Sequence, residues 1–556
     1  MLLSGSDILV KTLIEQGCDT VFGYPGGQIL NVYDSLYTHQ DEIHHILAAH
    51  EQGAAHAADG YARTTGKVGV VISTSGPGAT NLVTGIATAY LDSIPMVAIC
   101  GNVPTTQIGT DSFQEIDITG VTLPITKHNY FVGSVSQLAD TIREAFALAQ
   151  SGRPGPVLID VPKDVQIAQW DYQPQPPVRK EPPHGAKDVR IQEAAQYINE
   201  AQRPYIYFGG GLITVNAQEE MLALADKIDA PIGCSLMGLS GIPTDHPRFL
   251  GMQGMHGHYA SSMAMHHADL IISLGVRFND RVTGNRAKFA TRSKIIHLDV
   301  DGSELCKTVH AACGLRGDVK LTLQKLLPML EEKQKPQWMA QVNAFRLEEE
   351  NYLDNRDGLT PRSAILTLNQ HLEKNTAGAT DVGQHQMWSA QNLSFRTARR
   401  FVSSGGLGTM GFGLGAAIGA AFGTKERSVL VTGDGSFGMC LNELATAVSY
   451  NVPVVILIMN NGVLGMVRQW QTLFYNKHYS NTVLNRKTDF AALARAFGAE
   501  GEAVSAVEEL DAALTKDFRQ DGPYVIDCQI DKDEFVLPML PPGGSMDDII
   551  VKLEVK

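Results

Sequence analysis

The feature that most restricts the fold of this chain is a repeated alternation of apolar, β-branched runs with amphipathic helical patterns. Runs such as VGVVIST, PYIYFGGG and SVLVTGDG have the length of strands, and each is followed by a helix-like segment. Parallel strands need long crossover connections, which are usually helices. The sequence therefore predicts an α/β protein whose sheets are mostly parallel and flanked by helices.

Two stretches interrupt this alternation and divide the 556 residues into three blocks. Gln166–Asp188 is rich in Pro and polar residues, which is typical of an interdomain linker. Glu331–Arg362 is charged, and we expect it to be helical, with Gly358 and Pro361 closing the helix. The expected domains are residues 1–165, 189–330 and 355–556.

Composition excludes several classes of protein. The chain has 45 Lys and Arg against 59 Asp and Glu, a net charge of −14, which argues against a surface for nucleic acids or acidic membranes. Its longest apolar stretches, such as Val454–Met459, are far shorter than a membrane span. Seven cysteines without a CxxC pair suit a reducing compartment. We expect a cytoplasmic protein without a signal or transit peptide.

The first and third blocks share a sequence pattern. Gly-Pro-Gly at 76–78 and Gly-Asp-Gly at 433–435 are both followed by Ala-Thr-Ala, and eight residues later a Pro opens an apolar strand. We interpret the blocks as two copies of one fold, the alternative being chance similarity between two βαβ units. Asp434 occurs in the third copy, where the first has Pro77, so only the third could hold a cation at that place.

A carboxylate, Asp434, lies between Gly433 and Gly435 at the end of a buried strand. Ligands of open α/β sheets bind at this end of the strands, although Asp434 could instead cap the next helix. One helix and one strand later, Asn461 should return to the same sheet edge. Both side chains offer the oxygen ligands that Mg²⁺ prefers, and the helix start at Ser436 offers N–H groups to an anion. The spacing predicts a magnesium and diphosphate site.

This pair of motifs resembles the thiamin-diphosphate-binding motif. The resemblance implies that Mg²⁺ is held by Asp434, Asn461 and the backbone oxygen of Val463, and it places Gln384 and His385 on the diphosphate. It implies further cofactor contacts at Gly408, Met410, Gly465 and Met466.

Glu51, in AHEQGAAHAADGYAR, is the candidate for activating the cofactor. Thiamin chemistry requires C2 of the thiazolium to lose a proton, which a buried carboxyl group on the pyrimidine ring promotes. A Glu near a helix N-terminus is the alternative explanation, but HEQGA resembles the activating-glutamate motif of this family. Met410, in SSGGLGTMGFG, is the candidate for the apolar wedge that bends the cofactor; the alternative is core packing.

Glu51 and Asp434 lie in different blocks, so the cofactor must bridge two domains. Members of the family place that bridge between subunits. The resemblance therefore implies a homodimer or a dimer of dimers.

Further motifs narrow the resemblance along nearly the whole chain. FGYPGG, TSGPGATN, IGTDSFQE, GRPGPVLIDVPKD, GMHG, RFNDRVTG and GMVRQWQ resemble the acetohydroxyacid synthase (acetolactate synthase) large catalytic subunits, of the biosynthetic, FAD-containing type. Asn279 and Gly415 depart from the usual RFDDR and GLPAA patterns, without removing a needed charge.

The resemblance implies an activity and a partner. Such enzymes decarboxylate pyruvate and join the two-carbon unit to pyruvate or 2-oxobutyrate, giving 2-acetolactate or 2-aceto-2-hydroxybutyrate in branched-chain amino-acid biosynthesis. Biosynthetic members usually pair with a small regulatory subunit.

The acceptor acid carries a carboxylate, so we expect a cation in its binding site. Arg281 is our choice, because a guanidinium can bind a carboxylate bidentately; a surface ion pair is the alternative. Trp470 would favour the longer acceptor, although Trp is more often a core residue. The resemblance also places Gly27, Phe113, Gln114 and Lys163 around the reaction centre.

The middle block has the features of a dinucleotide site. A Gly-rich turn at Gly209–Gly211 follows one strand, and HLDVD ends another with two acids. Both suit a dinucleotide, and an NAD site is the competing interpretation. The resemblance implies FAD without a net redox role. The implied contacts are Arg153, Gly209, Gly210, Gly254, Met255, His256, Gly275, Val276, Arg277, Asp299 and Asp318.

Three alternatives remain open. One is a flavin-dependent pyruvate oxidase of the same superfamily, and another is the FAD-independent catabolic acetolactate synthase. The third is a non-catalytic binding protein with a vestigial site, which the presence of Glu51, Asp434 and Asn461 disfavours.

Overall fold

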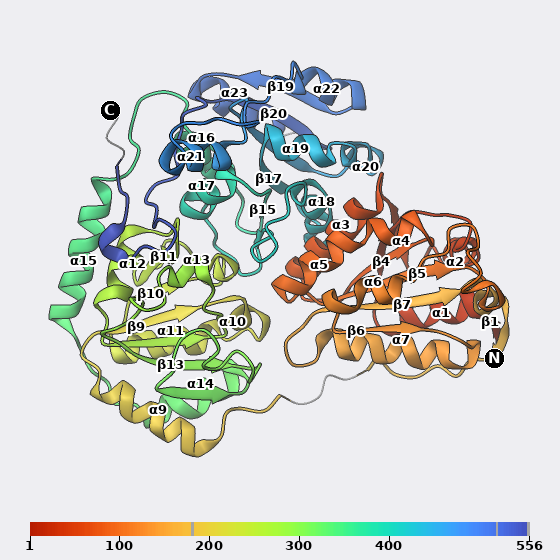
Figure 1. The fold of residues 1–556 in the computed structure, drawn as a ribbon, viewed down its shortest axis with the longest axis horizontal. Coiled ribbons are helices and arrows are strands. Elements are labelled where there is room, and N and C mark those ends of the chain that lie inside the picture. Colours follow the sequence, from red (N-terminus) through yellow and green to blue (C-terminus); the bar gives the residue numbers. More distant parts are fainter. Residues whose placement is uncertain (179–182, 519–520, 553–556) are drawn as a thin grey trace.

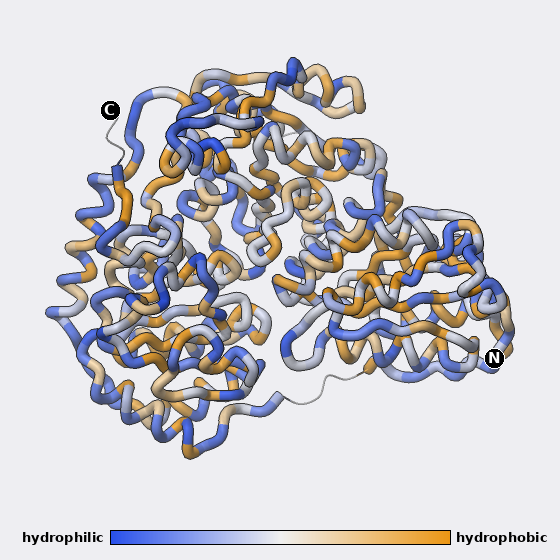
Figure 2. Tube along the Cα trace, viewed as in Figure 1, coloured by the Kyte–Doolittle hydropathy of each residue, from blue (hydrophilic) through white to orange (hydrophobic). Residues whose placement is uncertain are grey.

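The computed structural model describes residues 1–178, 183–518 and 521–552. Three six-stranded sheets, each parallel and flanked by helices, confirm the expected fold class (Figure 1). The first domain lies at the right of Figure 1, the middle domain at the lower left and the third domain along the top. In Figure 2 the apolar residues concentrate along the strands and on the inner faces of the helices.

The first domain contains a sheet in the order β3-β2-β4-β5-β7-β6. Its strands are β2 (Thr20–Gly23), β3 (His44–Leu47), β4 (Gly69–Ser73), β5 (Met96–Asn102), β6 (His128–Phe131) and β7 (Pro156–Pro162). Its helices are α1 (Gly5–Glu15), α2 (Leu30–Thr38), α3 (Glu51–Thr65), α4 (Pro77–Asn81), α5 (Val83–Asp92), η1 (Thr105–Gln107), α6 (Ile118–Thr122), η2 (Leu123–Ile125), α7 (Val135–Gln150) and α8 (Lys163–Ile167). Two short strands, β1 (Leu2–Ser4) and β8 (Gln169–Asp171), pair antiparallel, so the chain stays with this domain until residue 171.

The middle domain contains a sheet in the order β11-β10-β9-β12-β13-β14. Its strands are β9 (Pro204–Phe208), β10 (Ile232–Cys234), β11 (Phe249–Met252), β12 (Leu270–Leu274), β13 (Lys294–Asp299) and β14 (Cys313–Arg316). Its helices are α9 (Asp188–Glu200), α10 (Gly210–Thr214), α11 (Gln218–Ile228), η3 (Leu236–Gly238), α12 (Tyr259–His267), α13 (Asp280–Thr283), α14 (Val319–Leu326), η4 (Leu327–Met329) and α15 (Pro336–Glu350).

The third domain contains a sheet in the order β16-β15-β17-β18-β20-β19. Its strands are β15 (Ala377–Thr380), β16 (Phe401–Val402), β17 (Ser428–Gly433), β18 (Val454–Asn460), β19 (Glu500–Val504) and β20 (Tyr524–Gln529). Its helices are α16 (Pro361–His371), α17 (Gln384–Asn392), α18 (Gly413–Thr424), α19 (Asp434–Cys440), α20 (Glu443–Ser449), α21 (Gly465–Phe474), α22 (Phe490–Phe497) and α23 (Val507–Asp517). The short helix η5 (Met546–Asp548), near the end of the described chain, contacts α12 of the middle domain.

Strand order distinguishes the middle domain from the other two. Counted within each domain, the first and third sheets share one order, which confirms that they are copies of one fold. The order reverses between β2 and β4 in the first sheet and between β15 and β17 in the third. In the middle sheet it reverses between β9 and β12, as in dinucleotide-binding folds. Ligands of such sheets bind at these reversal points.

The expected helix over Glu331–Arg362 is wrong in its extent. Only α15 is helical there, and it packs on α12 through the buried residues Trp338 and Val342 of the middle domain's core. Pro361 instead begins α16, because proline lacks the N–H that the first turn leaves unpaired. Thr360 and Ser363 form a capping box there. Of the expected linker 166–188, residues 179–182 lie outside the described residues.

Helices α3 and α18 join the first and third domains through small residues (Figure 1). A Cβ added to Gly60 would lie 2.1 Å from the Ala416 carbonyl oxygen, and one added to Gly419 would lie 1.8 Å from that of Ala57. The backbones of the two helices are therefore in direct contact, which only glycine allows. In the described part of the chain, no helix is long and apolar enough to cross a membrane.

Candidate active site

Asp434 and Asn461 meet at the carboxyl edge of the third sheet. Strands β17 and β18 are parallel neighbours, and the backbone N–H groups of Asp434, Gly435 and Asn461 lie close enough to the Asp434 carboxylate to favour its charged form and lower its pKa. Burial raises the pKa of Asp434 to about 6. The side-chain amide oxygen (Oδ1) of Asn461 accepts a hydrogen bond from the N–H of Val463 at 3.2 Å. Asp434 begins α19, but its side chain does not cap that helix.

This edge fits a magnesium ion better than a metal bound by clustered side chains. Among the described residues, no three His, Cys, Asp or Glu side chains are grouped to hold a metal. A cation beside the buried Asp434 carboxylate would stabilise its charged form. The pKa of Asp434 would then fall back toward its ordinary value. Mg²⁺ typically combines one or two carboxylates with phosphate oxygens and water. Asp434 and its neighbours supply such an incomplete ligand set.

His385 and Gln384 lie beside this edge at the start of α17. The His385 ring packs on Gly433, where an added Cβ would lie 2.8 Å from Nδ1. Burial lowers the pKa of His385 to about 3, so the ring is neutral, and its buried Nε2 has no hydrogen-bond partner among the described residues. Gln384 is engaged within the protein, because its amide donates to the Glu534 carbonyl oxygen at 2.7 Å. His385 Nε2 is thus available to an anionic ligand.

Met410 lies in a loop that is anchored on both sides. The N–H of Gly411 donates to the carboxylate of Asp381 at 2.7 Å, and the N–H of Thr409 donates to the Ser404 hydroxyl at 3.0 Å. The Met410 methyl group would lie 3.9 Å from a Cβ added to Gly435. The candidate wedge therefore borders the predicted diphosphate site.

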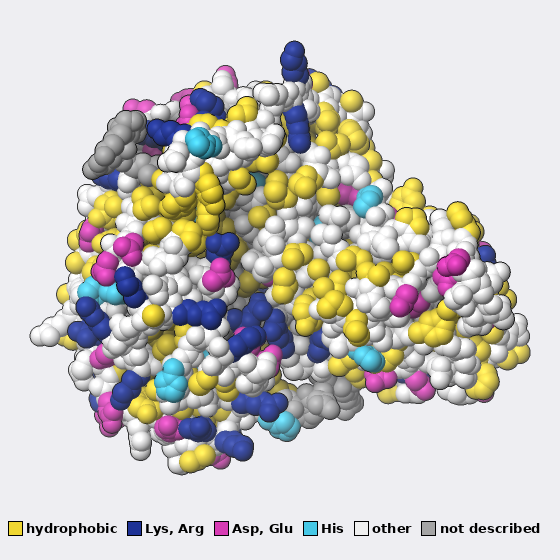
Figure 3. Space-filling model, in the orientation of Figure 1, with side chains coloured by type: hydrophobic (Ala, Val, Ile, Leu, Met, Phe, Trp, Pro, Cys, Tyr) yellow, Lys and Arg dark blue, Asp and Glu magenta, His cyan; other side chains and the backbone are white. Residues whose placement is uncertain are grey.

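A cavity of about 2180 Å³ opens between the domains. It exceeds the 300–1,000 Å³ typical of a single small-ligand site. Its walls include every residue that the resemblance assigns to FAD and five more of the expected site residues. The expected site residues that line it are Arg153, Gly209, Gly210, Gly254, Met255, His256, Gly275, Val276, Arg277, Arg281, Asp299, Asp318, Gly408, Met410, Met466 and Trp470. On the face shown in Figure 3, Lys and Arg side chains gather where the domains meet.

The middle domain's part of the cavity has the form of a dinucleotide site. Gly211 and Gly275 follow β9 and β12 at the reversal point, and a Cβ on either would lie 2.8 Å from the other's backbone. His256 is buried, with no hydrogen-bond partner for Nδ1 among the described residues, and burial lowers its pKa to about 4. Burial raises the pKa of Asp299, at the end of β13, to about 6. Close glycine turns and unpaired polar atoms fit a bound dinucleotide.

Arg281 and Trp470 face the same cavity from α13 and α21. The Arg281 side chain is 59% exposed, and its ion pair with Asp280 is long, at 3.9 Å. Its guanidinium also contacts the sulfur of Met255, at 3.5 Å. Arg281 is thus a loosely paired cation on the cavity wall.

Glu51 and its neighbours form a separate group. Gly27, Glu51, Phe113, Gln114 and Lys163 are not among the described residues that line the cavity. Glu51 begins α3 and accepts a hydrogen bond from Asn81 at 2.9 Å. The Lys163 amine donates to the Gly27 carbonyl oxygen at 3.2 Å, and Phe113 is 83% exposed. Within one chain, these first-domain residues lie outside the cavity lined by Met410.

Sequence reasoning missed two polar residues that hold the site in place. Asn81 orients Glu51, and Asp381 holds the Met410 loop. Asn81 ends the GPGATN motif and Asp381 opens DVGQHQ, so both belong to motifs already quoted. The spacing within these motifs did not reveal either hydrogen bond, because its two partners are 30 residues apart in the sequence.

Three family descriptions match the chain. They are the N-terminal TPP binding domain, the central domain and the C-terminal TPP binding domain of thiamine pyrophosphate enzymes, at residues 3–121, 191–326 and 381–528.

Several relatives resemble the whole chain. The acetolactate synthase large subunit of Buchnera aphidicola is 44% identical over 99% of this chain and 98% of its own length. The probable acetolactate synthase large subunit of Methanocaldococcus jannaschii is also 44% identical, over 100% of this chain and 96% of its own. The acetolactate synthase isozyme 2 large subunit of Escherichia coli is 43% identical over 99% and 100%. The chain therefore belongs to the acetolactate synthase large subunits of the thiamine pyrophosphate enzyme family.

Proposed function

We propose that this protein is an acetolactate synthase that joins a two-carbon unit from pyruvate to pyruvate or 2-oxobutyrate. The proposal rests on the full-length similarity to proteins of that name. The observation that carries it is the approach of Asn461 to Asp434 at the carboxyl edge of the third sheet. Met410, which lines the cavity, lies beside this edge. The products would be 2-acetolactate and 2-aceto-2-hydroxybutyrate, on the way to branched-chain amino acids.

Thiamin diphosphate and Mg²⁺ fit the third domain. Asp434, Asn461 and the Val463 carbonyl oxygen would hold the metal, and His385 and Gln384 would lie on the diphosphate. When bound, thiamin diphosphate supplies the carbon nucleophile and accepts the electrons released on decarboxylation. Met410 would keep it bent. Gly408, Ser436, Gly465 and Met466 would complete its binding site.

Glu51 would hold the proton that the pyrimidine ring requires, and Asn81 would orient its carboxylate. Because Glu51 lies outside the cavity of its own chain, we propose that a second copy completes the site. Gly27, Phe113, Gln114 and Lys163 would come from the same copy as Glu51. The exposed Phe113 would be covered in such a homodimer.

Arg281 would bind the carboxylate of the acceptor acid, because it is a loosely paired cation on the cavity wall. Trp470 would contact the acceptor side chain. One extra methylene group in an apolar pocket contributes roughly 1–3 kcal/mol, so a preference for 2-oxobutyrate is attainable.

FAD fits the middle domain, because the reversal point of its sheet borders the cavity. Gly211 and Gly275 lie close together there, and the Nδ1 atom of His256 has no partner among the described residues. Ligation of two 2-keto acids involves no net electron transfer, so we propose a structural role for it. The domain boundaries would fall near residues 165–189 and 330–355. Because the relatives are named large subunits, we also propose a small regulatory partner. The free cysteines suit a reducing compartment, so we propose a cytoplasmic location.

The deciding experiment is a product assay with mixed pyruvate and 2-oxobutyrate, with and without thiamin diphosphate and Mg²⁺. Formation of both acetohydroxy acids only with both cofactors supports the proposal. Oxygen or quinone consumption without acetolactate would instead identify a pyruvate oxidase. Full activity in a colourless, flavin-free protein would identify the FAD-independent catabolic type.

A further inference from the structure

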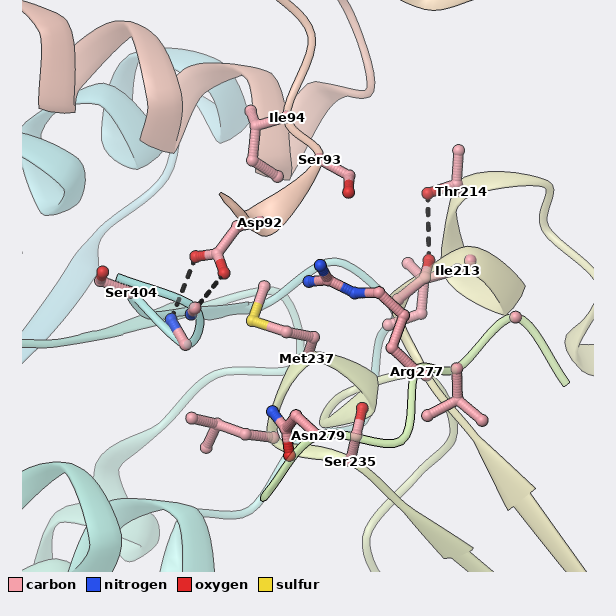
Figure 4. A pocket seen from close by; sticks show the side chains of 18 of the residues that line it. Asp92, Ser93, Ile94, Ile213, Thr214, Ser235, Met237, Arg277, Asn279 and Ser404 are labelled. Carbon is pink, nitrogen blue, oxygen red and sulfur yellow. Dashed lines mark hydrogen bonds between the residues drawn. The ribbon is translucent and has the colours of Figure 1, made fainter. Parts of the chain in front are cut away.

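The carboxyl end of α5 lies where all three domains meet at the cavity (Figure 4). The Asp92 carboxylate accepts hydrogen bonds from the backbone N–H groups of Gly405 at 3.0 Å and Gly406 at 2.7 Å. These glycines belong to the loop 403–411, which carries Met410. A side chain of the first domain therefore holds a loop of the third domain.

The residues on either side of Asp92 contact the flavin side of the cavity. The Leu91 carbonyl oxygen accepts a hydrogen bond from the guanidinium of Arg277 at 2.7 Å. The Ser93 hydroxyl accepts one from Nε of Arg153, also at 2.7 Å. Three consecutive residues thus bind two cavity-lining arginines and the Met410 loop.

The position of Asp92 is unfavourable for the helix itself. A carboxylate in the last turn lies at the negative end of the helix dipole, and the Asp92 side chain is fully buried. Arg63 compensates for it at 2.9 Å and donates to the Ser403 carbonyl oxygen at the start of the same loop. Arg63 also pairs with Asp59, whose side chain is equally buried. Within the described part of the chain, Asp92 binds the loop 403–411 and Asp59 binds Arg63 alone, which distinguishes the two acids.

The loop backbone lies directly on this group. A Cβ added to Gly406 would lie 2.9 Å from both the Asp92 carboxylate and the Leu91 Cβ. A Cβ added to Gly405 would lie 2.5 Å from the Met237 sulfur. Glycine at Gly406 therefore lets the loop backbone approach Asp92 and Leu91, whereas at Gly405 the flexible Met237 side chain could move aside.

We infer that Asp92 is a positioning residue, which sets the loop 403–411 and with it the Met410 wedge and one wall of the flavin cavity. This inference rests on the proposed function for the role of Met410. Thr88, one turn before Asp92, supports the same contact, because its hydroxyl bonds that of Thr409 at 2.8 Å. The first domain would thereby hold the wedge of its own chain in place.

The test compares Asp92→Asn with Asp59→Asn in the full-length holoenzyme. Both variants remove one buried negative charge from Arg63, but only Asp92→Asn weakens the bonds to Gly405 and Gly406. We expect faster hydrogen exchange in the peptide containing 403–411 for Asp92→Asn alone. We also expect its kcat to fall by about 10- to 100-fold, with the KM for pyruvate unchanged, because misplacing groups around the reacting centre costs rate.

Equal effects of the two variants on loop exchange, or none, would overturn the inference. Loop exchange is measured without turnover, so it does not depend on the proposed reaction. Absence of acetolactate from the wild-type enzyme would remove the proposed function and leave the exchange result standing. If Asp92→Asn does not fold, Gly406→Ala replaces it. Unaltered loop exchange and kcat in Gly406→Ala would likewise refute the role of this contact.

Discussion

Asp434 and Asp160 are both buried carboxylates in different copies of one fold; Asp434 directly follows β17, whereas Asp160 lies within β7. Burial raises the pKa of Asp434 to about 6 and that of Asp160 to about 7. Asp434 lies at a strand-order reversal, where a ligand can compensate for its burial. Asp160, in β7, accepts a hydrogen bond from the amide of Asn102 at 2.7 Å, and its other carboxylate oxygen has no partner among the described residues.

Asp160→Asn should stabilise the protein more at pH 8 than at pH 5. The folded-state pKa is above the ordinary aspartate value of 3.8, so wild-type stability falls as the pH rises from about 4 to about 7. Above pH 7 the penalty is complete, up to about 4 kcal/mol, and asparagine removes it. Melting temperatures of both proteins at the two pH values measure the difference. An equal change at both pH values would contradict the argument.

Glu51→Gln should lower turnover by at least about 100-fold and leave the fold intact, because it removes a proton-transfer group. Steady-state kinetics and circular dichroism measure the two effects. Glu42→Gln is the matched control, since Glu42 is an exposed acid of the same domain. Wild-type turnover in Glu51→Gln would remove the proposed role.

The contact between α3 and α18 determines how the first and third domains fit together at the scale of elements. Glycine in a helix interior normally costs about 1 kcal/mol relative to alanine. Gly60 and Gly419 remain because the facing backbones leave no room for a methyl group. Small residues are thus used here for close packing between domains.

Gly60→Ala should therefore destabilise the protein, although alanine favours helices. Its methyl group would lie 2.1 Å from the Ala416 carbonyl oxygen, so α3 must shift. We expect a melting temperature lower by a few degrees, for roughly 1–3 kcal/mol of overpacking. Gly438→Ala on α19 is the control, since its methyl group would contact only the end of the Arg486 side chain. A more stable Gly60→Ala variant would contradict this packing.

At the scale of the whole molecule, the expected catalytic residues form two groups. Met410, Trp470 and Arg281 line the cavity, whereas Glu51 and Lys163 do not. A second copy of the chain would have to bring Glu51 to the cofactor. This arrangement can be tested with two variants that are each inactive.

Mixing Glu51→Gln with Asp434→Asn should restore activity. Under the proposed arrangement, a mixed dimer contains one site with neither substitution and one with both. Random exchange of subunits should give about a quarter of wild-type activity, since half of the dimers are mixed. Acetolactate production after refolding the mixture measures it, with each variant refolded alone as the control. If activity does not recover, Glu51 and Asp434 of the same chain act in one site.

The sequence predicted some elements of the structure correctly and missed others. The alternation of β-branched runs and helices predicted the parallel sheets, and the βαβ connection predicted the approach of Asn461 to Asp434. The helix over Glu331–Arg362 was drawn too long, because charge alone does not reveal that Thr360 and Ser363 cap a new helix. The strand orders were not predicted, since they depend on pairing between distant segments.

By itself, the sequence determined what is local: the strand and helix periodicity, the Gly-Asp-Gly turn and the family of the chain. Only the tertiary structure decided that Asp92 contacts both Arg63 and Gly405, although Asp92 and Gly405 are 313 residues apart. The physical reason is that burial and charge compensation depend on which segments pack together. A sequence shows each charge, but not the partner that makes it tolerable in the core.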